Sequence, residues 1–138
     1  MLMMVQTDSN LVKTLKLWAR LYLLIWLAFL QFFVIFFSGL FAIDYLHSIV
    51  GFVVLALAIV NYRGLMKTSA PSRVKRISKV IPGMVTFDGL LGVGIFLLEE
   101  GTSLWVLSIM HLAVALAVIA QASSAATAYD MWEENEFR

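Results

Sequence analysis

Cysteine is absent from this chain of 138 residues, and charged residues are scarce. Without a thiol, the chain can form neither a disulfide nor a thiolate metal site, and it has no cysteine nucleophile. Charged side chains make up only 14% of the residues and apolar side chains 62%, whereas soluble domains have roughly a quarter and a half. This balance points away from a soluble protein and toward a chain that faces lipid.

Charge is missing from four long stretches of the sequence. Residues 21–43, 45–62 and 101–129 contain no Asp, Glu, Lys or Arg. Residues 80–98 contain only Asp88. A helix needs about 20 mostly apolar residues to cross the hydrocarbon core of a bilayer. We therefore predict four transmembrane helices, at approximately residues 17–37, 40–62, 81–98 and 104–129.

The connections between these helices are predicted from turn residues. Ser38 and Gly39 are expected to form a tight outer turn, and residues 99–103 a second one. Pro82 is expected in the first turn of the third helix, where its missing N–H costs nothing. Residues 130–138 are expected to form a short acidic tail.

Basic residues are absent from both predicted outer turns. Three of the ten Lys and Arg residues lie before or in the first turn of the first helix, six lie in the middle connection between residues 63 and 79, and Arg138 ends the chain. By the positive-inside rule, both termini and the middle connection are cytoplasmic. We thus predict a single all-α domain, residues 1–138, folded as a four-helix up-down bundle that crosses the cell membrane several times. The lipid bilayer explains the basic run, so no nucleic-acid partner is predicted.

The two histidines of the chain occupy similar places in the predicted helices. His47 lies about seven residues into the second helix and His111 about seven into the fourth, which puts each about 10 Å below the outer end. These helices run parallel and can face each other diagonally in an up-down bundle. Two imidazoles at one depth suit the two axial positions of a haem iron. We therefore predict that His47 and His111 bind haem.

Small residues follow both histidines at a distance of one helical turn. Gly51 follows His47, and Ala115 follows His111. Small side chains leave room for a flat macrocycle, and both positions are predicted to line the cofactor. The same residues also allow helix backbones to pack closely without any cofactor.

Two carboxylates accompany the histidines. Asp44 lies on the same helical face as His47; it is either a functional group or a solvated residue in the first helical turn, where the helix dipole favours it. Asp88 lies deeper, midway along the third helix, and needs a partner there. It is either a proton-relay or ligand-contacting group, or a buried acid bonded to Gln31, Ser108 or a backbone carbonyl.

Three segments together resemble the haem A synthase family. Asp44-Tyr-Leu-His47 is similar to the Glu-x-x-His signature that opens the second helix of that family's four-helix unit. Asp88 with the following Gly-Leu-Leu-Gly-Val-Gly looks like the third helix of the unit, and Met110-His111-Leu-Ala-Val-Ala looks like the fourth. The resemblance implies a haem held by His47 and His111, with Asp44 in the place of the catalytic glutamate. It also implies oxidation of the haem O methyl group to the formyl group of haem A, in a homo-oligomer of single units.

Two departures from that family keep other functions open. Asp44 is one methylene shorter than glutamate, and Ser48 stands where the family usually has arginine. The first alternative is a b-type cytochrome with two histidine ligands, which carries electrons as a subunit of a quinol-linked respiratory complex. The second is a haem-free accessory subunit of a membrane complex. For the haem A synthase and cytochrome hypotheses, the expected cofactor is haem, either b-type or haem O/A.

Overall fold

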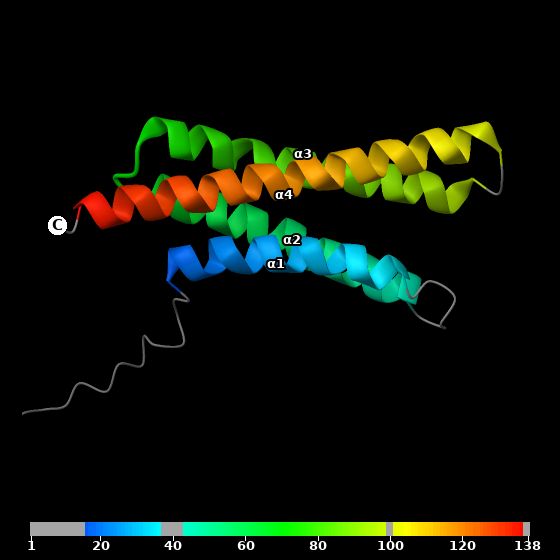
Figure 1. The fold of residues 1–138 in the computed structure, drawn as a ribbon, viewed down its shortest axis with the longest axis horizontal. Coiled ribbons are helices and arrows are strands. Elements are labelled where there is room, and N and C mark those ends of the chain that lie inside the picture. The colour runs from blue at the N-terminus through cyan, green and yellow to red at the C-terminus, as the bar shows by residue number, and fades with distance from the viewer. Residues whose placement is uncertain (1–15, 37–42, 99–100, 137–138) are drawn as a thin grey trace, which may run out of the picture.

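The computed structural model of the chain describes residues 16–36, 43–98 and 101–136, and this described part is built from helices alone. The chain runs up and down through them, so that consecutive helices are antiparallel (Figure 1). Each helix is long and apolar enough to cross a membrane. The four-helix prediction is confirmed; the placement in a bilayer with cytoplasmic termini stays a prediction. The helices are α1 (Leu17–Phe36), α2 (Ile43–Met66), α3 (Ser72–Leu97) and α4 (Thr102–Glu136).

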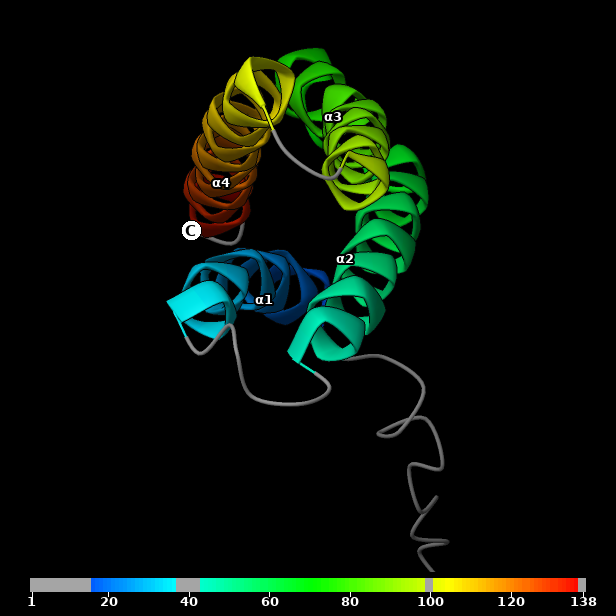
Figure 2. The same cartoon turned by 90° about the vertical axis from the view of Figure 1, so that its right-hand side faces the viewer.

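The helices form a ring in chain order. Each helix packs against its two neighbours, and α4 closes the ring against α1. Seen from the end of the bundle, α2 and α4 therefore lie diagonally across from each other (Figure 2). This arrangement confirms the diagonal relation that the up-down topology predicts for the two helices that carry histidine.

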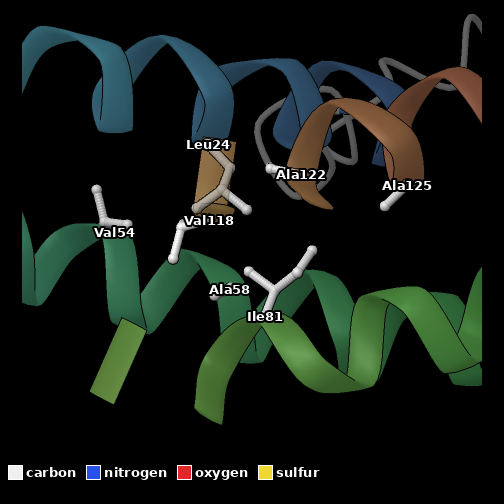
Figure 3. Packing of buried hydrophobic residues seen from close by; sticks show 7 residues of the cluster. All are labelled: Leu24, Val54, Ala58, Ile81, Val118, Ala122 and Ala125. Atoms are coloured by element: carbon white, nitrogen blue, oxygen red, sulfur yellow. The ribbon is translucent and has the colours of Figure 1, made fainter. Parts of the chain in front are cut away.

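Small and branched apolar side chains from all four helices meet in the core (Figure 3). The alanines of this core, on α2 and on α4, let each of these helices approach its neighbours in the ring closely, which is how helices associate in lipid. A second cluster, which includes Leu65 and Tyr129, closes the end of the bundle where the chain ends. The central cluster consists of Leu24, Val54, Ala58, Ile81, Val118, Ala122 and Ala125.

The outer surface of the bundle is strongly apolar. Trp26, Phe52 and Phe96 are 67%, 73% and 81% exposed. Exposed apolar area of this extent is rare on soluble monomers, since water would drive such surfaces together. A hydrocarbon environment satisfies it without cost.

The middle connection is much shorter than the sequence predicts, and the prediction that Pro82 opens the third helix is wrong. α3 begins at Ser72, so residues 67–71 alone link it to α2. Lys and Arg are good helix formers, and Val74, Ser78 and Ile81 follow one another at helical spacing and are buried. Packing of that stripe extends the helix through the basic run.

Pro82 therefore lies inside α3. Its ring removes one backbone donor, a loss that helices in lipid tolerate when other groups compensate. The donor that Pro82 lacks would bond the carbonyl of Ser78, four residues earlier; the hydroxyl of Thr86 donates a separate hydrogen bond of 2.9 Å to the carbonyl of Pro82 and does not replace it.

The acidic tail is also helical for most of its length. α4 continues to Glu136 instead of ending near residue 129. The hydroxyl of Tyr22 on α1 donates a hydrogen bond of 2.5 Å to the carboxylate of Asp130, and the ring of Trp132 packs 5.6 Å from that of Tyr129. The hydrogen bond from Tyr22 holds the last turns of α4 against α1, and Trp132 packs against the second cluster.

Only part of the predicted turns can be compared with the structure. The turn at residues 38–39, Glu99 and Arg138 lie outside the described residues. Gly101 directly precedes α4 and has a φ of 125°, a conformation that favours glycine because a Cβ would clash there. Thr102 and Ser103, which were predicted in this turn, are instead the first residues of α4.

The predicted topology can be tested with single thiols, because the chain has no cysteine of its own. We expect the S103C variant to react with a membrane-impermeant maleimide from the outer side of the membrane, and the K67C variant to react only from the cytoplasmic side. Labelling of intact cells and of inverted vesicles measures both. Reaction of the two variants from the same side would contradict an odd number of crossings between them.

Close packing at Ala125 can be tested by enlarging its side chain. Ala125 is fully buried, with 0% exposure, so leucine at this position should lower the free energy of unfolding by about 1–3 kcal/mol through overpacking. Ala120, which is exposed on the same helix, supplies the matched control A120L. Thermal unfolding of both variants in detergent, followed by circular dichroism, measures the difference; equal stability would contradict the described core.

Candidate functional site

The rings of His47 and His111 meet inside the bundle. Their centroids are 6.1 Å apart and their planes are inclined by 65°. The two rings come from the diagonal helices α2 and α4, which make no backbone contact with each other in the described part of the chain. The side chains alone therefore bridge the space between these helices.

The predicted equal depth of the histidines holds for the rings but not for the count of residues. His47 is the fifth residue of α2, and His111 is the tenth residue of α4. The count of about seven residues is wrong for the fourth helix, which begins at Thr102 instead of near residue 104. The predicted start of the second helix, near residue 40, lies outside the described residues.

Asp88 of α3 holds the ring of His111. Nδ1 of His111 lies 3.0 Å from the backbone oxygen of Asp88 and 2.9 Å from its Oδ1. The hydrogen-bond geometry favours the backbone oxygen, and Oδ1 makes no hydrogen bond of its own. Both atoms are acceptors, so Nδ1 of His111 carries the hydrogen, and in the neutral ring Nε2 has a free lone pair. A side-chain nitrogen with a lone pair can bind a metal ion.

The side chain of Gln31 on α1 bonds the backbone of His47, the other histidine of the site. Its Nε2 donates a hydrogen bond of 3.1 Å to the carbonyl of His47. Gly51 makes this contact possible, because a Cβ at that position would lie 3.4 Å from the same nitrogen. Gly51 therefore faces a side chain of α1, and a flat ligand would have to share this space with Gln31.

Both polar contacts join residues that lie at similar distances from the neighbouring ends of their two helices. Asp88 lies nine residues before the end of α3, and His111 lies nine residues after the start of α4. Gln31 lies five residues before the end of α1, and His47 lies four after the start of α2. In an antiparallel hairpin, residues equally distant from the turn lie at the same level. From the sequence, Gln31 was predicted only as a possible partner of Asp88, and the structure does not bring these two residues together.

An apolar layer separates the site from the core. Val50 and Val114 lie one turn beyond the two histidines, and Val85 lies one turn before Asp88. All three are partly buried and pack against the central cluster. On the other side, the side chains of His111 and Asp88 keep 22% and 18% of their surface exposed. The site is thus closed toward the core and partly open toward its surroundings.

Three other residues complete the surroundings of the histidines. Asp44 is exposed in the first turn of α2, and the hydroxyl of Ser48 donates to its backbone oxygen. No hydrogen bond or ion pair of the Asp44 carboxylate occurs within residues 16–36, 43–98 and 101–136. Ala115 is half-buried one turn beyond His111. Gly92 of α3, which is not among the predicted site residues, lies directly against the His111 ring, since a Cβ at this position would lie 3.5 Å from Cε1.

The donor set of the site suits haem better than a bare metal ion. In the described residues, no three His, Cys, Asp or Glu side chains gather in a group that could hold a metal. Haem needs only two protein ligands, because the porphyrin supplies four nitrogens. A nitrogen ligand binds a metal at about 2 Å, and the ring centre lies about 1.2 Å behind it, so two axial imidazoles have centroids about 6.4 Å apart.

The observed separation of 6.1 Å agrees with that value. Nδ1 of His47 is also buried without a hydrogen-bond partner, a costly state that a ligand could relieve. Both observations concern the two imidazoles as donors to one iron; the space beside Gly51, where a macrocycle was predicted to lie, holds the side chain of Gln31.

Comparison with models of protein families, with curated proteins and with solved structures finds no match to this chain. The resemblance to the haem A synthase family thus stays a prediction from the motifs around Asp44, Asp88 and His111.

Proposed function

We propose that the protein is a membrane haem protein in which His47 and His111 are the two axial ligands of one iron. The observation that carries this proposal is the separation of their ring centroids, 6.1 Å across the bundle from diagonal helices. Two polar rings in an apolar bundle are costly unless they serve a function. Shared ligation of one iron explains their position, their distance and their common level.

Each residue of the site has a role in this proposal. His111 binds through Nε2, while Asp88 accepts the hydrogen of Nδ1 and fixes the ring. A carboxylate behind a ligating histidine makes the imidazole more basic. When bound, haem supplies one-electron redox chemistry. Val50 and Val114 close the site toward the core and keep water away from that side.

Electron transfer is the activity that this geometry favours. Two permanent histidine ligands leave no coordination position for a substrate, which suits a b-type cytochrome. The contact between Asp88 and His111 supports a fixed ligand, and the exposed carboxylate of Asp44 offers no support for a catalytic role. A redox partner in the membrane, such as a subunit of a respiratory complex, would then deliver or accept the electron.

Haem A synthesis is the second candidate, because the chain resembles that family in three of its four helices. Asp44 lies three residues before His47, in the place of the family's glutamate. This activity requires that haem O enters as a substrate, and a homo-oligomer would have to supply the second haem.

The histidine ligands can be tested by replacement. We expect the purified chain to show a reduced-minus-oxidised Soret and alpha band. H47A and H111A should each lose more than about 90% of the haem, because one remaining axial ligand binds haem in a membrane bundle weakly. A pyridine haemochrome spectrum measures the amount and the type of haem.

Two further variants keep this test decisive. S108A removes a hydroxyl that is exposed and bonds its own helix, so it should retain haem. H111M replaces one ligand by a thioether, which should raise the midpoint potential and change the spectrum if His111 binds the iron. A colourless wild-type protein, or an unchanged spectrum in H47A and H111A, would contradict the proposal.

The role of Asp88 can be tested with D88N, which keeps the shape of the side chain but removes its charge. We expect haem to stay bound and the midpoint potential to rise by some tens of millivolts, since a less basic imidazole stabilises ferric iron less. Potentiometric titration measures the shift.

The matched control is D44N, which removes an exposed carboxylate at the same end of the bundle. An electron carrier should keep its potential in D44N, and cells that also make haem O should yield no extractable haem A from either form. Haem A that forms with the wild-type chain and disappears in D44N would instead establish the second candidate.

A further inference from the structure

A basic groove lies at the end of the bundle opposite to the histidines. It runs between the start of α1 and the end of α2, which lie side by side at the end where the chain finishes (Figure 1). Its volume is about 490 Å³. The groove is lined by Leu17, Arg20, Val60, Arg63, Gly64, Lys67 and Thr68.

Three cations line this groove and no acidic side chain does. Arg20, Arg63 and Lys67 form no ion pair with a carboxylate in the part of the chain that the structure describes, where the only such pair is His111 with Asp88. Nε of Arg20 is buried and has no hydrogen-bond partner. A buried donor without an acceptor is costly. The groove thus combines positive charge with an unused donor.

The shape of the groove is fixed by contacts between α1 and α2. The fully buried Asn61 donates a hydrogen bond of 3.0 Å from Nδ2 to the carbonyl of Arg20. The side chain of Arg20 then lies over Gly64, where a Cβ would come within 2.9 Å of its Nη2. These two contacts place the guanidinium against α2 instead of leaving it in solution.

The groove lies where the helices end, which is the level of the lipid headgroups for helices of this length. Basic pockets between transmembrane helices on the cytoplasmic side bind phosphate headgroups. Leu17 and Val60 give the same groove apolar walls on which an acyl chain can lie. We propose that this groove binds the phosphate of an anionic phospholipid. The site does not depend on the haem proposal, because it shares no residue with the histidine site.

The test compares lipids retained by the full-length chain in native mass spectrometry. After delipidation in a neutral detergent, the chain is mixed with phosphatidylglycerol or with phosphatidylcholine of the same acyl chains. We expect about tenfold more retained phosphatidylglycerol than phosphatidylcholine. The double variant R63Q/K67Q should lose this preference.

Matched variants separate the groove from general charge. R73Q/R76Q removes the same charge from exposed positions on α3 and should keep the preference. G64A changes no charge but displaces the Arg20 guanidinium, so it should reduce retention; G83A, where a Cβ meets nothing within 4 Å, should not.

Three results would overturn the proposal. The first is equal retention of both lipids, and the second is equal loss in R63Q/K67Q and R73Q/R76Q. The third is displacement of phosphatidylglycerol by millimolar inorganic phosphate, which would identify the groove as a site for free phosphate.

Discussion

A polar group inside an apolar bundle needs a partner within the protein, because lipid offers none; short hydroxyl side chains bond their own helix, while longer side chains reach a neighbouring one. The described interior follows this constraint around the ring. Gln31 and Asn61 bond α1 to α2, Tyr22 bonds α1 to Asp130 of α4, and Asp88 bonds α3 to His111 of α4. Apolar side chains can slide past one another with little change in energy, whereas each of these bonds exists at one register only. The few polar residues therefore fix the level at which the helices meet.

The sequence predicts the helices well because the absence of charge is a direct requirement of a hydrocarbon core. It predicts their ends poorly for the same reason. Lysines and arginines mark where a segment leaves the hydrocarbon, but they do not end a helix, and α3 continues through its basic run because Val74, Ser78 and Ile81 pack on the bundle. Likewise, α4 passes residue 129 because Tyr22 holds Asp130. These helix ends depend on tertiary contacts, which cannot be predicted from the hydropathy of the sequence.

The candidate site was predictable in its histidines and not in their partners. The meeting of His47 and His111 follows from topology, since parallel helices in a four-membered ring lie diagonally. The pairing of Asp88 with His111 depends on the length of the second hairpin, which requires the start of α4 to be known. The position of Gln31 depends further on the absence of a side chain at Gly51. To predict such contacts, one must know both the register of the paired helices and the space left by the side chains around them.

Glycines in this bundle serve side chains of neighbouring helices more than contacts between backbones. A Cβ at Gly51 would meet Gln31, one at Gly92 would meet the ring of His111, and one at Gly64 would meet Arg20. In each case a polar side chain lies against the helix that carries the glycine, and a Cβ at that position would push the side chain away. Small residues in a membrane helix are commonly taken as packing positions or as room for a cofactor. Here Gly51, Gly64 and Gly92 make room for a polar group itself, whereas a Cβ at Gly94 would meet the apolar Leu107.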